Sequence, residues 1–377
     1  MKIILFTIVM LLANSIVLSS FAEANESPLK QSKTVSDIHN VKCKPHLTLI
    51  FTAQEWIPAC VKPSSVNKLI ERGWAADHDP HHMMMPISSE KVFFTLQGDS
   101  QVGSIGKENL DAGTAMTYVS SNYDGSLVLA TSSGSDTVYA FDMSQKKLIS
   151  TILVGETPKG IKIHPDESMA LVANEASGTV GVIDLDSFTM TKEIQVGQTP
   201  HNVRFDSAGG IAYVTLQGED KIAVIDVKSL EMTDSISVGE LPHNLDLSPD
   251  DRHIYTVNIG TSDVAVIDLQ SKEIVKRIKV STGHHGIDVS NDGKRIYVSG
   301  IGSDKMNVID TQSLELIKQV DVGQGPHGIR TSVDGNKVFV GITTTNEILV
   351  IDTTTFEVKD VIQSGNTPFW LAVGGNP

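Results

Sequence analysis

The chain has few basic residues relative to acidic ones, and it lacks the short motifs that mark several large classes of protein. It contains 30 Lys and Arg residues against 45 Asp and Glu residues, a net charge of −15. This balance argues against nucleic acid or an anionic membrane surface as a partner, because both need basic patches. The C-x-x-C-H signature of covalent haem is missing. A phosphate-binding loop, a G-x-S-x-G elbow and an H-E-x-x-H motif are also missing, so we expect no haem and no nucleotide.

Cysteine is scarce as well: Cys43 and Cys60 are the only two. In an exported chain such a pair indicates one disulfide, which contributes roughly 3 kcal/mol in the chain-entropy model. The alternative, half of a metal site, lacks nearby ligands at zinc-finger spacing. We therefore expect residues 41–76 to form a small disulfide-linked module. Its stretch Pro58–Trp74 is similar to a Cys-paired module of exported archaeal proteins, a resemblance that implies the compartment and no chemistry.

The first 24 residues have the pattern of an export signal. Lys2 precedes an apolar run over residues 3–18, and Ala22-Glu23-Ala24 fits a cleavage site with small residues. We expect residues 1–24 to be a signal peptide, residues 25–40 a linker, and the protein to be secreted or held at the cell surface. The run is slightly long for a signal, so an uncleaved membrane anchor is the alternative, and only that alternative gives membrane contact.

A 42-residue repeat dominates the rest of the chain, residues 91–377. Each copy holds four short runs rich in β-formers, separated by Gly, Pro, Asn and Asp turns, as in the copy that starts at Pro200. Such a unit predicts one four-stranded antiparallel blade of a propeller. An aspartate that recurs at the end of the third run marks six complete blades and is expected to cap turns: Asp142, Asp184, Asp226, Asp268, Asp310 and Asp352.

The seventh blade has to be assembled from both ends of the repeat region. The last copy stops after one strand, residues 369–373, while residues 92–98 copy the second strand of a blade. We therefore predict an all-β, seven-bladed propeller whose ring is closed by N- and C-terminal strands, with a shortened outer strand within residues 106–114. Closure of this kind removes exposed sheet edges. The segments Tyr213-Val214-Thr215-Leu216 and Tyr255-Thr256-Val257-Asn258 resemble the YVTN-repeat propellers of archaeal and bacterial surface and secreted proteins.

One position at the start of each blade forms the main candidate site. In a propeller the first strands line the central channel, so the equivalent residues meet at one mouth of it. Neutral imidazole is a common ligand of copper and zinc, and four histidines, together with the adjacent His284, share this position with Lys159. The alternative is a structural role, with each imidazole bonded to a carbonyl of a neighbouring blade. The seven positions are Thr117, Lys159, His201, His243, His285, His327 and Phe369.

A second, weaker candidate precedes the propeller in residues 77–90. Imidazole together with thioether is a soft ligand set that suits copper. A linker with accidental enrichment in these residues is the alternative. The ligands in question are His78, His81, His82, Met83, Met84 and Met85.

Histidines gathered at the hub of a seven-bladed propeller resemble the copper-bearing propellers of nitrous-oxide reductase and thiocyanate dehydrogenase. That resemblance extends only to the four hub histidines, with Lys159 as an electrostatic partner, and no electron-transfer domain accompanies them. The leading hypothesis is an exported binding protein whose hub takes a metal ion, copper in particular, or a small ligand. The alternatives are a copper-dependent oxidoreductase and a structural or protein-interaction propeller that uses one face for a protein partner and has no site.

Overall fold

The computed structural model describes residues 48–51, 58–61, 69 and 90–375 and forms two compact units. In the described part of the first unit, β1 (Thr48–Phe51) and β2 (Pro58–Val61) pair in antiparallel fashion. No helix among the described residues is long and apolar enough to cross a membrane.

Several sequence predictions fall outside these ranges. The signal peptide, the two linkers, the His/Met-rich segment and Cys43 all lie outside the described residues. The disulfide between Cys43 and Cys60 therefore stays a prediction, as do export and the second metal site.

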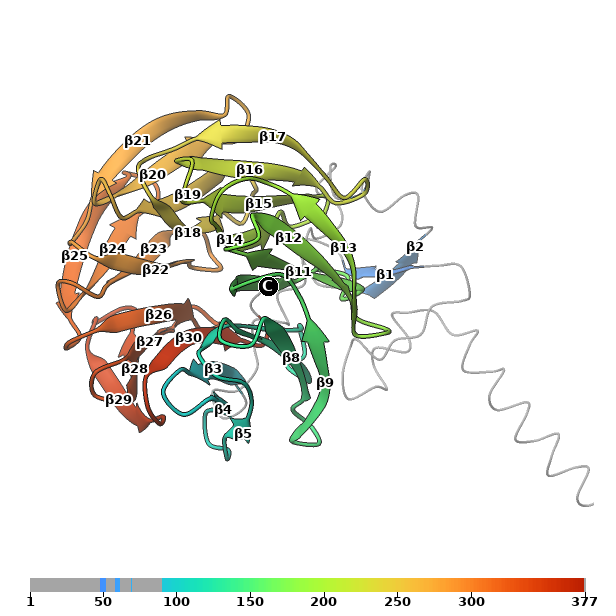
Figure 1. The fold of residues 1–377 in the computed structure, drawn as a ribbon. Coiled ribbons are helices and arrows are strands. Elements are labelled where there is room, and N and C mark those ends of the chain that lie inside the picture. The colour runs from blue at the N-terminus through green and yellow to red at the C-terminus, as the bar shows by residue number, and fades with distance from the viewer. Residues whose placement is uncertain (1–47, 52–57, 62–68, 70–89, 376–377) are drawn as a thin grey trace, which may run out of the picture. The chain divides into compact units, whose positions relative to one another are not determined.

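The second unit is the predicted propeller, built of seven four-stranded antiparallel sheets (Figure 1). The innermost strands are β6 (Met116–Ser121), β10 (Pro158–Ile163), β14 (Pro200–Phe205), β18 (Pro242–Leu247), β22 (His284–Val289), β26 (Pro326–Thr331) and β30 (Pro368–Val373). The second strands are β7 (Leu127–Ser132), β11 (Met169–Asn174), β15 (Ile211–Leu216), β19 (His253–Asn258), β23 (Arg295–Gly300), β27 (Lys337–Ile342) and β3 (Val92–Leu96).

The two outer layers of each blade complete the sheets. The third strands are β8 (Thr137–Asp142), β12 (Thr179–Asp184), β16 (Lys221–Asp226), β20 (Asp263–Asp268), β24 (Lys305–Asp310), β28 (Glu347–Asp352) and β4 (Gln101–Ser104). The outermost strands are β9 (Lys147–Leu153), β13 (Thr189–Gln195), β17 (Glu231–Ser237), β21 (Glu273–Lys279), β25 (Glu315–Asp321), β29 (Val358–Gln363) and β5 (Leu110–Asp111).

Burial follows the position of a strand in its blade. Second strands such as β15 are buried on both faces, because neighbouring blades pack against each side of the sheet. Outermost strands such as β17 expose most of their residues and bury only one or two apolar side chains. The inner strands are therefore buried along nearly their whole length, as expected where both faces of a sheet are covered.

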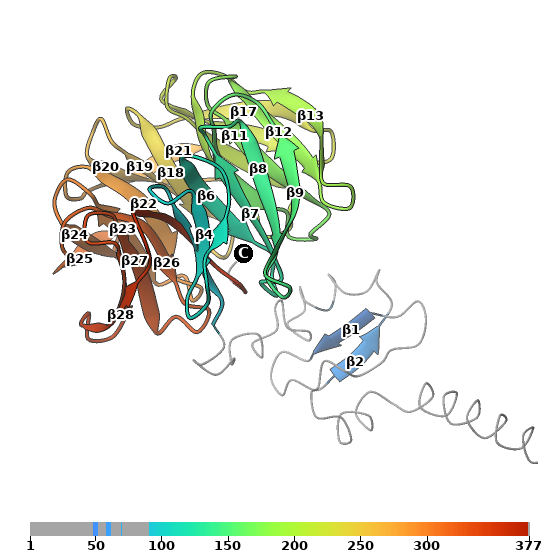
Figure 2. The same ribbon diagram turned by 60° about the horizontal axis from the view of Figure 1, so that its bottom comes forward.

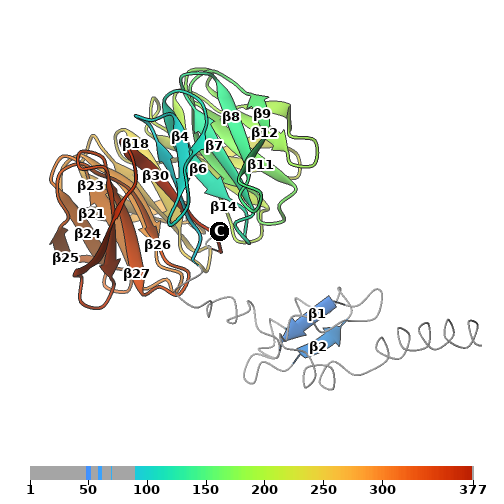
Figure 3. The ribbon, with the colours of Figure 1, turned by 90° about the horizontal axis from the view of Figure 1, so that it is seen from below.

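The ring closes as the sequence predicts. Strand β30 pairs with β3, with Val373 opposite Val92, and the order of this sheet is β30-β3-β4-β5. The two residues of β5 confirm the shortened outer strand. Side views place the red C-terminal strand among the cyan strands that begin the propeller (Figure 2, Figure 3). Trp370, 1% exposed, packs in this seam with Tyr118 and Phe93 and so ties the last strand to the first blades.

The repeated aspartates cap turns, as predicted. Asp142, for example, accepts hydrogen bonds from the backbone amides of Ser144 and Gln145, both at 2.9 Å. Hydrogen bonds from Ser144 lower the pKa of Asp142, because they stabilise its ionised form. The same arrangement recurs from blade to blade and explains why an aspartate returns every 42 residues.

Candidate functional site

A β-bulge at the start of every innermost strand aims the site residues at the channel mouth. In β14 the pairing with β15 jumps from Pro200 to Val203, so His201 and Asn202 occupy the bulge. The same jump occurs in the innermost strands of the other six blades. Bulges re-aim side chains at functional positions in sheets. Here they turn one residue of each blade towards the central axis.

In four of the seven blades a hydroxyl on the second strand completes the bulge and joins it to the next blade. It belongs to Thr95, Thr131, Thr215 or Ser299. Thr215 Oγ1 accepts from the Asn202 amide at 2.9 Å and donates to the carbonyl of His243, also at 2.9 Å. Ser299 bridges the amide of Gly286 and the carbonyl of His327 in the same way. These buried backbone groups would otherwise lack partners, so the recurring hydroxyl has a structural cause. It also fixes the spacing between neighbouring mouth residues.

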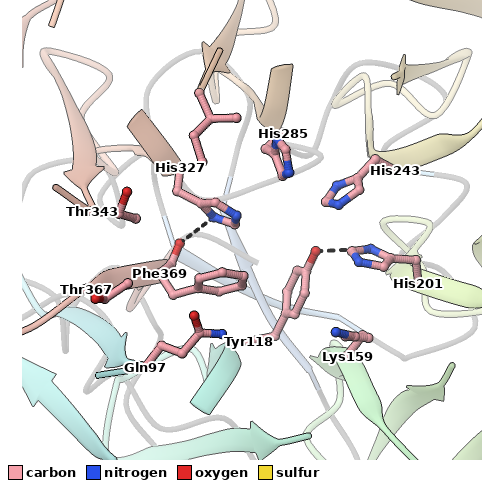
Figure 4. A pocket seen from close by; sticks show the side chains of 11 residues that line it. Gln97, Tyr118, Lys159, His201, His243, His285, His327, Thr343, Thr367 and Phe369 are labelled. Atoms are coloured by element: carbon pink, nitrogen blue, oxygen red, sulfur yellow. Dashed lines mark hydrogen bonds between the residues drawn. The ribbon is translucent and has the colours of Figure 1, made fainter. Parts of the chain in front are cut away.

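Four histidine rings and one phenylalanine ring form a continuous arc at the mouth (Figure 4). The ring centroids of His201 and His243 lie 4.0 Å apart, those of His243 and His285 4.6 Å, and those of His285 and His327 4.9 Å. Phe369 continues the arc at 3.9 Å from His327. The sequence prediction that these side chains share one mouth is therefore confirmed.

Three of the rings donate a hydrogen from Nδ1 to a partner in the protein. Nδ1 of His327 donates to the carbonyl of Phe369 in the next blade at 2.8 Å, and Nδ1 of His285 to the carbonyl of Gly283 at 3.1 Å. Tyr118 donates its hydroxyl hydrogen to Asn244, so Nδ1 of His201 donates to that hydroxyl, at 3.2 Å. In each neutral ring with Nδ1 protonated, the lone pair resides on Nε2.

His243 has the opposite tautomer. The side-chain amide of Asn244 donates to its Nδ1 at 2.7 Å, and the same amide donates to the carbonyl of His285 at 2.6 Å. The hydrogen of a neutral His243 ring therefore resides on Nε2. The four imidazoles are thus similar in position and different in what they offer a ligand.

The buried rings of His201 and His327 stay uncharged at neutral pH. Burial, followed by the charge of Lys159, lowers the pKa of His201 to about 3. Burial, followed by the neighbouring His285, lowers the pKa of His327 to about 3 as well. Neutral imidazole is the form that binds metal ions and accepts hydrogen bonds, so the mouth is ready for either role.

The arc lines one side of a cavity of about 340 Å³. Lys159, which the sequence assigns to the same position, lies on the other side with Gln97, and its Nζ is 3.4 Å from a carboxylate oxygen of Glu175. The cation of the mouth is therefore largely balanced within the protein. Cavities of this size accept small molecules as well as ions.

Sequence reasoning missed two residues that organise the site, Tyr118 and Asn244. Each directly follows a mouth position and thus belongs to the bulge. Tyr118 is buried, with its ring 4.4 Å from that of Trp370. The residues that follow the mouth positions also recur every 42 residues, and Tyr118 and Trp370 are the first and last of this set. The spacing would therefore have revealed them. Their contact depends on ring closure, which brings the two ends together.

The described residues contain no group of three or more His, Cys, Asp or Glu side chains arranged to hold a metal ion. The mouth histidines pack ring against ring, and their nitrogens do not form a ready-made ligand set. His284 begins β22, and its side chain lies outside the described parts of the chain.

His164 directly follows an innermost strand, where the sequence places a turn and so predicts a side chain that faces solvent, and this prediction is wrong. Its ring is buried, with Nδ1 2.5 Å from Asp166 and Nε2 2.8 Å from the carbonyl of Gly209 in the next blade. The reason is tertiary: the turn after β10 packs against the neighbouring sheet. His253, placed in a turn by the sequence, instead begins β19 and is half-buried.

A second layer of side chains lies deeper in the channel, three residues along from the mouth positions. The mixture of charges at these positions predicts neutralising salt bridges, and two are present: Arg204 contacts Asp246, and Arg330 contacts Asp288, both at 3.2 Å. Lys162 belongs to the same layer.

Comparison with known proteins identifies the fold family. The YNCE-like beta-propeller family matches this chain over residues 62–249 and 139–337, which together span more than half of its length. No curated protein matches.

Among solved structures, a Kuenenia stuttgartiensis hydrazine synthase chain is similar, with a TM-score of 0.62 and 19% identity over 69% of this chain and 90% of that one. A functionally unknown protein from Desulfotomaculum acetoxidans DSM 771 gives 0.66 and 14% over 77% and 100%. The dihydro-heme d1 dehydrogenase NirN in complex with DHE gives 0.59 and 16% over 78% and 77%. At such identities the likeness establishes the propeller fold alone.

Proposed function

This chain belongs to the YNCE-like beta-propeller family, and we propose that it is a binding protein that takes its ligand at the imidazole-lined mouth of the channel. Propellers host binding, scaffolding and catalysis alike, so the proposal depends on the site and not on the fold. The observation that supports it is the arc of four histidines around one cavity of about 340 Å³.

Copper is the metal ion that we propose binds at this mouth. His201, His285 and His327 each have Nδ1 held by a protein acceptor, with the lone pair on Nε2. Metal-binding histidines have this arrangement, because the outer hydrogen bond fixes the tautomer and orients the ring. Imidazole nitrogen suits copper well, and neutral rings do not have to lose a proton before they bind.

The packing of the rings sets a limit on this proposal. Since no three ligands are assembled among the described side chains, copper would have to rotate at least two imidazoles away from their ring contacts. Reorganisation of this kind consumes part of the binding free energy. We therefore expect weaker binding than at a preassembled copper centre, and we do not extend the proposal to redox turnover.

Copper binding can be measured on the full chain by titration followed by gel filtration and metal analysis. The His285→Ala, His327→Ala double variant should retain about one copper ion fewer than the wild type. The His253→Ala variant is the matched control, because it removes a histidine from a strand start outside the mouth. The His/Met-rich segment is unchanged in all three proteins and so contributes equally. Equal copper content in wild type and double variant would refute the copper proposal.

A small organic ligand is the second candidate, favoured by the size of the cavity. A volume of about 340 Å³ exceeds what one ion fills, and Tyr118 and Phe369 add aromatic surface to its wall. Native mass spectrometry of the purified protein tests this directly. An organic ligand should survive a copper chelator and be lost in Phe369→Ala, whereas copper should be lost to the chelator.

We further propose that the protein is exported and is related to the YVTN-repeat propellers, on the grounds of its N-terminal pattern and of Tyr213-Val214-Thr215. Sequencing of the mature N-terminus tests export. A chain that begins near Asn25 supports a cleaved signal, and an intact Met1 contradicts it.

A further inference from the structure

The second layer of the channel has a charge imbalance that its own residues do not remove. Three cationic side chains and two carboxylates occupy it, together with a serine and an alanine. Both carboxylates are committed to arginines, through the Arg204–Asp246 and Arg330–Asp288 contacts. One positive charge is left over. The seven residues are Ser120, Lys162, Arg204, Asp246, Asp288, Arg330 and Ala372.

The carboxylates also accept further hydrogen bonds from the protein. Oδ2 of Asp288 accepts from the backbone amide of Thr331 at 2.6 Å and from its hydroxyl at 2.7 Å. Oδ2 of Asp246 accepts from the amide of Val289 at 2.9 Å. Within the described part of the chain, no carboxylate forms an ion pair with Lys162. The unmatched charge therefore belongs to this lysine.

A small chamber of about 10 Å³ adjoins Lys162. Arg204 and Arg330 also line it, and no carboxylate does. Ser120 contributes a hydroxyl whose oxygen already accepts from the amide of Ile163 at 3.2 Å, so its hydrogen is available to a ligand. A chamber of this volume has room for a single compact species. A buried cation beside a polar, water-sized space is a favourable place for a counter-ion.

We propose that this chamber binds a single compact monovalent anion of the chloride class. Three cationic side chains and one hydroxyl supply the attraction, and the volume excludes phosphate, carboxylates and nucleotides. The bound ion would neutralise the one charge that the layer leaves unmatched. This site is separate from the mouth, because it shares no lining residue with the larger cavity.

Lys162 gives the site a dependence on pH. In the empty chamber, burial, followed by repulsion from Arg204 and Arg330, lowers the pKa of Lys162 to about 7, against the attraction of Asp246 and Asp288. An anion favours the charged amine, so binding takes up a proton near neutral pH. Anion affinity should therefore fall as the pH rises above about 7.

Thermal unfolding of the full chain tests the proposal. At pH 6 and constant ionic strength, replacing gluconate by chloride should raise the unfolding temperature by roughly 2–4 °C. The reason is that an ion bound only to the folded state stabilises it, and a shift of this size is typical for a large domain. Lys162→Met should abolish the shift. Lys159→Met is the matched control, since it removes a lysine from the same strand at the mouth and should leave the shift intact. Equal midpoints of the wild type in chloride and gluconate would overturn the proposal.

A second measurement does not depend on any variant folding. Crystals of the wild-type protein soaked in bromide should show an anomalous scatterer in the chamber beside Ser120 and Lys162. A chamber that holds only water under the same conditions would contradict anion binding there. Neither result depends on copper or an organic ligand at the mouth, so the two proposals can fail separately.

Discussion

Acidification should destabilise the propeller through its mouth histidines, and the size of the effect follows from their burial. His201 and His327 have pKa values of about 3 in the folded protein, against about 6.5 in an unfolded chain. Between these values the unfolded state binds more protons, so stability is full above pH 6.5 and is lost progressively as the pH falls towards 3. Between pH 7 and pH 5 each ring lowers the free energy of unfolding by roughly 2 kcal/mol. Each pH unit below the pKa of the unfolded state contributes about 1.4 kcal/mol.

A variant is needed to isolate the contribution of one ring, because another buried group titrates in the same range. Burial raises the pKa of Asp288 to about 6, against the opposing effect of Arg330. Protonation of Asp288 therefore favours the folded state on acidification. The net change in wild type is therefore smaller than the sum over the histidines. His327→Phe removes one titrating ring and replaces it with the residue found at the equivalent position 369. Its loss of stability from pH 7 to pH 5 should be smaller than that of the wild type by roughly 2 kcal/mol.

Urea denaturation followed by circular dichroism at both pH values provides the measurement. The His327→Phe variant also loses the hydrogen bond to the carbonyl of Phe369, but that loss is the same at both pH values and cancels in the difference. His253→Gln, a change outside the mouth, should keep the wild-type difference. If His327→Phe loses as much stability on acidification as the wild type, the ring is not held neutral by burial and the reasoning is wrong.

Three substitutions test the framework around the site, each by urea denaturation at pH 7. Thr215→Val keeps the shape of the side chain but leaves two buried backbone groups unpaired, so we expect a loss of about 1–3 kcal/mol, and none from Thr233→Val on the exposed outer strand. Asp246→Asn removes the partner of Arg204 and should cost about 3 kcal/mol. Gly328→Ala should cost about 1–3 kcal/mol, because its Cβ would lie 2.8 Å from backbone atoms of the next blade. A neutral result in any of the three would contradict the contact on which it depends.

The 42-residue repeat is sufficient to predict the architecture from the sequence alone. Each 42-residue copy contains its own four strands. In the copy that begins at Pro200 the β-rich runs of the sequence predict strands with the observed bounds, Pro200–Phe205, Ile211–Leu216, Lys221–Asp226 and Glu231–Ser237. Antiparallel neighbours joined by short turns depend on local sequence alone, which is why this part could be predicted. Closure of the ring followed from counting to seven, and the short strand Leu110–Asp111 from the missing length.

By itself, therefore, the sequence determined the blades, their number, the closing strands and the row of histidines at one depth in the channel. Only the tertiary structure decided what those histidines can do. The tautomer of His201 depends on Tyr118, the tautomer of His243 on Asn244, and the burial of His164 on the next blade. The chamber beside Lys162 is a space between the innermost strands of several blades. The His243–Asn244 hydrogen bond joins neighbours in sequence. The other features arise between blades, from contacts more than 42 residues apart, and no local pattern within one repeat specifies them.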